Sequence, residues 1–153
     1  MKKKLIFFSY KGPHKDSADD NVAAIRKAAA DFNTYQNTYE AKLWEDYKKT
    51  TSISKEILDV IDICDVFVAD LTYFNHNVLF ELGYAIGKDK EILILLNCNK
   101  NDSEKNYREF ILKDIRYSDF GNSKQVQKAL QQKSYQSGLL KKYLNLQNTT
   151  ALS

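Results

Sequence analysis

The chain has 153 residues, 43% of them hydrophobic and 28% charged, which suits one domain with its own core and excludes two domains of ordinary size. The formal net charge is +3, but five lysines and no acid lie after residue 123, so residues 1–123 carry a net charge of −2. A solvated helix face accounts for this basic segment, and contact with nucleic acid or an acidic partner is the alternative. No apolar run approaches the roughly 18 residues of a membrane span, and the short apolar run after Lys2–Lys4 is about half of a signal-peptide core. We therefore expect a cytoplasmic protein without a membrane partner. Because a solvated face accounts for the basic segment, we expect no nucleic-acid partner either.

The first third of the chain predicts a strand, a helix and a weaker second strand. "KKKLIFFSY" is a short apolar run that Gly12 and Pro13 interrupt, and the acids that follow suit the start of a helix over residues 20–33. Residues 34–51 show no clean period. We place a short second strand at residues 38–43.

The middle of the chain predicts a βαβ unit. Residues 52–63 have apolar positions at helical spacing behind a candidate capping box. Residues 66–69 and 91–96 are continuous apolar runs, which strands covered on both faces of a parallel sheet require. A helix begins near Asn77 between these two strands, so a right-handed crossover is expected.

The last third predicts a short helix at residues 107–112, an edge strand within 114–120 and a final helix over 122–146 that Ser137 and Gly138 interrupt. We therefore expect one α/β domain at residues 1–146, with a single open, mainly parallel sheet and helices on both faces, as in flavodoxin-like folds. Residues 147–153 are expected to form a flexible tail or linker.

Ligands of open parallel sheets bind beyond the carboxyl ends of the strands. Applied to the predicted strands, this rule selects Ser9, Tyr10 and Lys11 after the first strand, Asp70 after the strand at 66–69, and residues 97–99 after the strand at 91–96. The loop from Leu71 to Asn77 lies on the same edge, and it leads into the helix that carries Glu81.

Glu81 is a charge within an otherwise apolar helix. Helical spacing places Val78, Leu82, Ala85 and Ile86 on the apolar stripe, with Asn77 and Glu81 on a neighbouring face. One interpretation is an ordinary acid in the first turn, where the helix dipole favours it. The other is an acid that faces a ligand. Spacing alone leaves both open, as it does for Asp70, which could cap the turn that follows it.

Cysteine and histidine usage favours neither a disulfide nor a metal site. Cys64 and Cys98 lie in hydrophobic contexts without CxxC spacing, which is typical of reduced thiols in or near a core. His14 and His76 have no partner at ligand spacing. We expect no metal and no cofactor.

One segment resembles a known signature. "ADLTYFNHNVLFELGYA", Ala69 to Ala85, is similar to the "ADLT-x-x-N-x-N-V-x-x-ELG-x-A" pattern of nucleoside 2-deoxyribosyltransferase-like and bacterial TIR-like nucleotide-binding domains. The opening "LIFFSYKG" also resembles the first strand and loop of TIR domains. The resemblance covers residues 4–98 and supports the α/β fold expected above.

The resemblance implies that Glu81, before the "LG" dipeptide, is the catalytic residue, and that the substrate has an N-glycosidic bond. Cleavage of that bond builds oxocarbenium character at the ribose anomeric carbon, which a carboxylate can stabilise or attack. It further implies that Asp70 and Asn77 hold ribose hydroxyls. Ser9, Tyr10 and Lys11 would meet the phosphates or the adenine side.

The sequence departs from the signature at two points. His76 stands where proline is frequent, which leaves the loop more flexible. The glycine-threonine step that precedes the glutamate in deoxyribosyltransferases is missing, and this omission favours the TIR-like branch. We therefore expect an NAD-cleaving effector of bacterial defence, with NAD as substrate, that is activated by self-association or by a sensor domain. A nucleoside or nucleotide N-glycosidase or deoxyribosyltransferase is the first alternative, and a non-catalytic signalling or scaffold module is the second.

Overall fold

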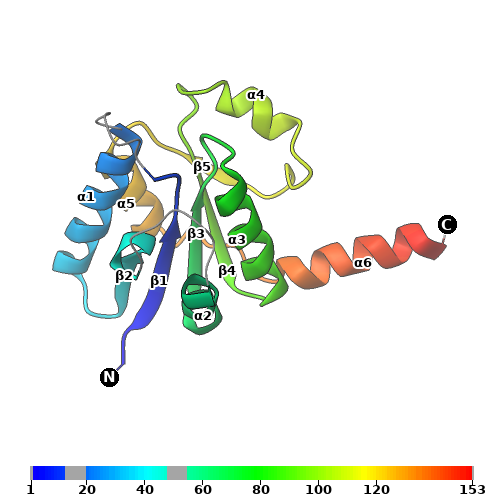
Figure 1. Ribbon diagram of the computed structural model, residues 1–153, viewed down its shortest axis with the longest axis horizontal. Coiled ribbons are helices and arrows are strands. Elements are labelled where there is room, and N and C mark those ends of the chain that lie inside the picture. The colour runs from blue at the N-terminus through cyan, green and yellow to red at the C-terminus, as the bar shows by residue number, and fades with distance from the viewer. Residues whose placement is uncertain (1, 13–19, 48–54, 153) are drawn as a thin grey trace.

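A single all-parallel sheet forms the centre of the molecule (Figure 1). The computed structural model describes residues 2–12, 20–47 and 55–152. Its five strands lie in the order β2-β1-β3-β4-β5, which confirms the predicted fold class. The strands are β1 (Lys4–Ser9), β2 (Tyr39–Leu43), β3 (Val66–Asp70), β4 (Glu91–Leu96) and β5 (Tyr117–Asp119). We call the end of the sheet at which the strands stop the carboxyl edge, and the opposite end the amino edge.

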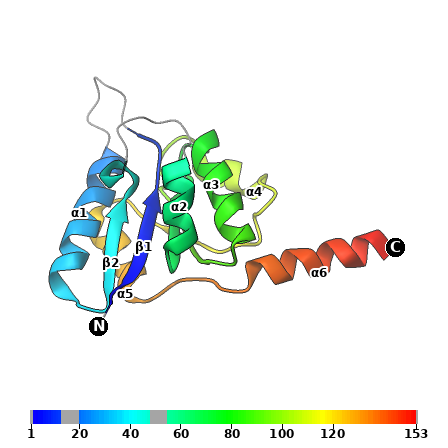
Figure 2. The same ribbon diagram turned by 60° about the horizontal axis from the view of Figure 1, so that its bottom comes forward.

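Helices cover both faces of the sheet (Figures 1 and 2). The helices α1 (Asp20–Tyr35) and α5 (Ser123–Gln131) pack on one face, and α2 (Lys55–Ile63) and α3 (His76–Gly87) pack on the other. A 3₁₀ turn (Trp44–Asp46) follows β2, and α4 (Ser103–Arg108) follows β4. The last helix, α6 (Leu139–Leu152), starts beside the body and then extends away from it (Figure 2).

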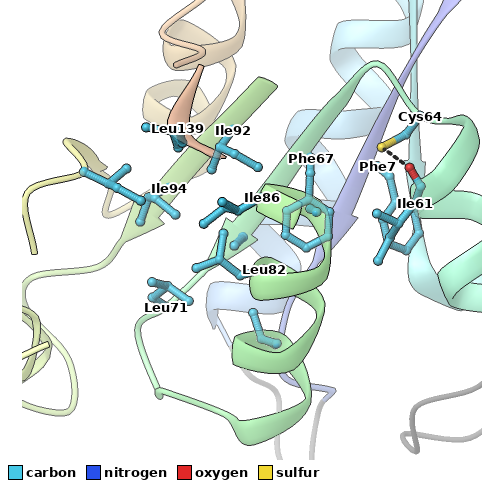
Figure 3. Packing of buried hydrophobic residues seen from close by; sticks show 14 of the residues in the cluster. Phe7, Ile61, Cys64, Phe67, Leu71, Leu82, Ile86, Ile92, Ile94 and Leu139 are labelled. Carbon is cyan, nitrogen blue, oxygen red and sulfur yellow. Dashed lines mark hydrogen bonds between the residues drawn. The ribbon is translucent and has the colours of Figure 1, made fainter. Parts of the chain in front are cut away.

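Burial on both faces explains the apolar runs in the sequence. All five residues of β3 are buried, and they alternate between two core clusters. Phe67 and Ala69 pack against α2 and α3, where Figure 3 shows Phe67 near Leu82 and Ile86, whereas Val66 and Val68 face α1 and α5. Each large apolar side chain buried in this way stabilises the fold by about 2 kcal/mol, so no position in β3 is free to be polar until its last residue.

Two predicted helices differ from the structure, and the start of a third lies outside the described residues. The helix predicted at 107–112 lies earlier, as α4, because the buried Ser103 begins it with a 2.6 Å hydrogen bond from its hydroxyl to the Asn97 carbonyl. The final helix is two helices, α5 and α6. The predicted helix start at residues 52–54 lies outside the described residues.

The break between α5 and α6 follows from the sheet. Lys133 and Gly138 have left-handed backbone angles, with φ of 51° and 72°, and between them Gln136 forms an antiparallel bridge with Ile92 at the start of β4. The helix α6 then covers most of residues 147–153, which were predicted to be a flexible tail, while the domain boundary at residue 146 stays a prediction. None of the helices in the described ranges is long and apolar enough to cross a membrane.

Candidate active site at the carboxyl edge

A buried hydrogen bond joins β1 to α3 at the carboxyl edge. The Ser9 hydroxyl donates to Oε2 of Glu81 over 2.7 Å, and the two side chains are 2% and 6% exposed. Ser9 is the last residue of β1, next to Ala69 of β3 in the strand register. The strand-end rule and the signature thus selected two residues that the fold brings together from 72 positions apart.

The start of α3 sets the position of Glu81. Asn75 is the N-cap, and its side chain accepts hydrogen bonds from the backbone N–H groups of Asn77 and Val78. Glu81 therefore lies in the second turn, and α3 has no acid in its first turn. The interpretation of Glu81 as an ordinary first-turn acid is wrong: this carboxylate is buried and bonded to another element.

A second polar cluster at the carboxyl edge centres on Asp70. Its Oδ1 accepts hydrogen bonds from the backbone N–H and the hydroxyl of Thr72, at 3.1 and 2.5 Å, and its Oδ2 accepts a longer one from Asn21 of α1. The side-chain amide of Asn97 donates to Oδ1 of Asn21 over 2.8 Å, and the backbone N–H of Asn97 donates to the Thr72 hydroxyl. Asp70 therefore caps the turn that follows β3, which was one of its two interpretations, and its contact with a ribose stays a prediction.

The two polar clusters lie toward opposite faces of the sheet. Glu81 belongs to α3, on the face that Phe67 and Ala69 contact. Asp70 follows Ala69, so its side chain alternates to the other face, where it meets Asn21 of α1. Beyond the strand ends, a ligand across the top of β1 and β3 would have Glu81 on one side and Asp70 on the other.

Tyr10 is held in a group of its own. Its hydroxyl donates to Glu45, which also pairs with Arg26 of α1 at 2.5 Å. Burial, followed by the neighbouring Glu45, raises the pKa of Tyr10 far above its ordinary value. The Tyr10 hydroxyl is thus occupied in joining the end of β1 to the turn after β2, and its ring packs near Trp44.

Lys11 and Asn77 lie near the rim of the carboxyl edge. The Lys11 ammonium stands 4.8 Å from the centre of the Tyr73 ring, which links the loops after β1 and β3. Asn77 is half-buried at the start of α3, where its backbone N–H bonds to the cap. Among the described residues, no group of three His, Cys, Asp or Glu side chains could hold a metal ion.

Sequence reasoning missed three residues that build this edge. Asn21 connects Asp70 with Asn97, and Arg26 and Glu45 fix Tyr10. Asn21 and Arg26 lie within α1, so the strand-end rule could not select them, whereas Glu45 follows β2 by two residues, where the rule would have pointed to it. A polar residue that stays buried in the first turn of a helix, as Asn21 does at 2% exposure, gives no signal in the sequence.

A buried glutamate thus lies on the helix after the third strand, at the carboxyl edge of an all-parallel sheet. A family model also matches most of the chain. The chain belongs to the nucleoside 2-deoxyribosyltransferase family, whose model matches residues 7–130. Glycosyl transfer and N-glycosidic bond cleavage are the activities to which this membership points. No curated protein matches the sequence itself.

Solved structures share the fold. The CMP N-glycosidase BcmB of Clostridium botulinum aligns with a TM-score of 0.54 at 18% identity, over 84% of this chain and 98% of that one. A conserved protein of Enterococcus faecalis V583 aligns with a TM-score of 0.53 at 13% identity, over 86% and 99% of the two chains. A 2-deoxyribosyltransferase of Leishmania mexicana is 26% identical over 61% of this chain and 65% of that one, with a TM-score of 0.46.

Proposed function

We propose that the protein is an N-glycosidase that cleaves the bond between ribose and base in a nucleotide, with Glu81 as the catalytic carboxylate. The observation that carries the proposal is the buried Ser9–Glu81 hydrogen bond at the edge of the sheet where ligands of this fold class bind. A carboxylate held by a hydroxyl keeps one orientation, which a group acting on a single carbon atom requires. Family membership supports the same chemistry.

The proposed reaction begins when the C1′–N bond breaks and its electron pair leaves with the base, which takes up a proton from water when it is not already cationic. Positive charge develops on C1′ and the ring oxygen, and the Glu81 carboxylate stabilises it or forms a bond to C1′. Water then adds to C1′ and loses a proton to the solvent; any bond between Glu81 and C1′ breaks at this step with its electron pair returning to the carboxylate, and the sugar is released. If a second base attacks in place of water, the same steps give transfer of the sugar rather than hydrolysis.

Lys11 favours a substrate with phosphate over a plain nucleoside. Its ammonium lies at the rim of the carboxyl edge over the Tyr73 ring, and in the described part of the chain it forms no ion pair with an acid. A cation in that position attracts a phosphate with little loss of existing contacts. We therefore infer that Ser9 and Asp70 lie near the ribose, and Lys11 near the phosphate.

NAD is the second candidate substrate, and the environment of Asp70 favours it. A neutral base needs a proton as it leaves, whereas the nicotinamide of NAD is already cationic and needs none. Both Asp70 oxygens accept hydrogen bonds, from Thr72 and from Asn21, so this carboxylate is arranged as an acceptor rather than as a proton donor. One carboxylate, Glu81, would then suffice for NAD.

The test incubates the purified chain with nucleosides, nucleoside 5′-monophosphates and NAD, and measures released base by chromatography. We expect Glu81→Gln to reduce release roughly 10²- to 10⁴-fold, the usual loss for a positioned catalytic group. Glu56→Gln, which removes an exposed acid of α2, is the matched control and should act like the wild type. Base release at the wild-type rate by Glu81→Gln would refute the proposal, and the preferred substrate decides between nucleotide and NAD.

The role in bacterial defence rests on the TIR-like resemblance alone, and we propose it only together with NAD cleavage. Effectors of that kind are activated by self-association or by a sensor. Specific activity should then rise with protein concentration or with molecular crowding. A specific activity that is constant over a hundredfold range of concentration would remove this part of the proposal.

A further inference from the structure

A second hollow lies at the amino edge of the sheet, at the opposite end of β1 from Ser9. We call it the amino-edge pocket. It has a volume of about 250 Å³ and lies where α1 ends, β2 begins and α5 ends. Its main lining residues are Phe32, Tyr35, Tyr39, Leu130, Gln131 and Lys133. Five residue steps along β1 separate the two edges, roughly 16 Å, so a molecule in this pocket would not touch Glu81.

The pocket has an apolar floor and aromatic walls. Phe32 and Leu130 are buried, at 5% and 1% exposure. Tyr39 is half-buried, and its backbone is fixed by the side chain of Gln36, which accepts from the Tyr39 N–H over 2.6 Å. Tyr35 is 76% exposed, which leaves a large aromatic face open beside the hollow. Aromatic faces around an apolar floor suit a flat ring.

Two cations stand at this aromatic wall. The ammonium groups of Lys133 and Lys4 lie 5.7 and 6.0 Å from the centre of the Tyr39 ring. Neither lysine forms an ion pair with an acid in the ranges that the structure describes. Of these two lysines, Lys133 lines the pocket and Lys4 does not, so Lys133 is the cation that an anion in the pocket would meet.

The helix ends weaken this positive charge, but that of α5 is partly satisfied. The carbonyl ends of α1 and α5 lie at the pocket, and a free helix end is equivalent to about half of a negative charge. At the end of α5, the backbone N–H groups of Lys133 and Ser134 already donate to the carbonyls of Leu130 and Ala129. Lys4 borders a separate hollow, so Lys133 is the lysine that supplies positive charge to the amino-edge pocket.

We propose that the amino-edge pocket is a second binding site, for a small flat aromatic molecule that carries an anionic group. The ring would lie over Phe32 and Leu130 against Tyr35, and the anionic group would lie beside Lys133. The volume is below the roughly 300 Å³ at which pockets for drug-sized ligands begin. The ligand is therefore one or two rings with one charged group, and a whole dinucleotide is too large.

The test uses two fluorescent probes with the full chain: naphthalene-1-sulfonate, a two-ring aromatic anion, and 1-naphthalenemethanol, which has the same two rings without the charge. We expect saturable binding of the sulfonate to one site. We expect Lys133→Gln and Tyr35→Ala each to weaken it about tenfold or more. The uncharged probe should bind more weakly than the sulfonate to the wild type, and Lys133→Gln should remove that difference.

Matched controls distinguish binding at this site from non-specific binding of the probe and from binding at the carboxyl edge. Lys128→Gln removes an exposed lysine of α5, the helix that ends at the pocket, and Ile111→Ala removes an exposed apolar side chain, at 86% exposure. Both should bind the sulfonate like the wild type, as should Glu81→Gln. The proposal is overturned if Lys133→Gln and Lys128→Gln bind equally well, or if Glu81→Gln abolishes binding. Circular dichroism checks that each variant is folded.

Discussion

At the scale of single residues, the carboxyl edge depends on the hydroxyl of Ser9, whose partner could not be read from the sequence. A buried carboxylate without partners costs several kcal/mol, so Glu81 can stay at 6% exposure only because it is hydrogen-bonded. Ser9 supplies one such bond from a different element. It is therefore the residue through which β1 controls how the carboxylate of α3 is oriented.

Ser9→Ala should lower kcat for base release by about 10- to 100-fold and change KM little. A hydrogen bond to a charged group is worth about 1.5–3 kcal/mol, and its loss lets the Glu81 carboxylate rotate. Steady-state kinetics on the substrate found for the wild type measures both constants.

Ser118→Ala, in the half-buried edge strand β5, is the control for removal of a strand hydroxyl and should leave kcat unchanged. An unchanged kcat in Ser9→Ala would show that Glu81 is oriented by its other surroundings.

At the scale of elements, α2 and α3 are joined by a polar contact outside the core. The Tyr84 hydroxyl of α3 donates to Asp62 of α2 over 2.7 Å, and Lys88 lies 3.4 Å from the same carboxylate. The hydrogen bond from Tyr84 and then the charge of Lys88 lower the pKa of Asp62 below its ordinary value of 3.8. Because these groups are exposed, the contact orients α3 more than it stabilises the fold.

Tyr84→Phe should raise the pKa of Asp62 toward its ordinary value. Since the wild-type pKa is lowered by folding, the associated stability is present above the unfolded pKa and is lost as the pH falls through the folded one. The difference in stability between wild type and Tyr84→Phe should therefore shrink below about pH 4.

NMR titration of the Asp62 carboxyl carbon measures this shift, and Tyr35→Phe, a tyrosine far from Asp62, is the control. A pKa of Asp62 that is the same in Tyr84→Phe and wild type would refute the assignment of the hydrogen bond as its main cause.

Elements that depend on local patterns could be predicted from the sequence, and those set by distant partners could not. The apolar runs of β3 and β4 and the stripe of α3 are visible because both faces of the sheet are covered. The end of α5 is set by the bridge between Gln136 and Ile92, which no local signal reveals. The same division holds for the candidate site, where Ser9 and Glu81 could be selected but Asn21 could not.

At the scale of the whole molecule, the two cysteine thiols lie at opposite edges of the sheet. Cys64 lies at the amino edge before β3, is 2% exposed, and burial raises its pKa to about 12. Cys98 follows β4 at the carboxyl edge and is half-buried; burial and then Asp119 raise its pKa as well. Both cysteines are free, in agreement with the prediction of reduced thiols.

A disulfide reagent such as 5,5′-dithiobis(2-nitrobenzoate) should label one thiol of the native protein at pH 8, and that thiol should be Cys98. With a pKa of about 12, only about one in 10⁴ of the Cys64 side chains is ionised at pH 8, and those are shielded by the core. Cys64 should react only as fast as the molecule opens globally.

Cys98→Ser isolates the second phase, whose rate should rise steeply with denaturant. Equal labelling rates for both thiols in the native protein would contradict the burial of Cys64. If nucleotide substrate slows the labelling of Cys98, the ligand lies over the end of β4.

The strand order has a consequence for the moment at which the protein can become active during synthesis. β1 is the first strand made, yet it lies inside the sheet, between β2 and β3, and Ser9 waits for a partner 72 residues further along the chain. The ribosome must therefore release α3 before the hydrogen bond between Ser9 and Glu81 can form, and β4 must follow before β3 has a neighbouring strand on each side. A nascent chain that stops short of β4 contains both residues of the pair, but it lacks the strand that completes the centre of the sheet.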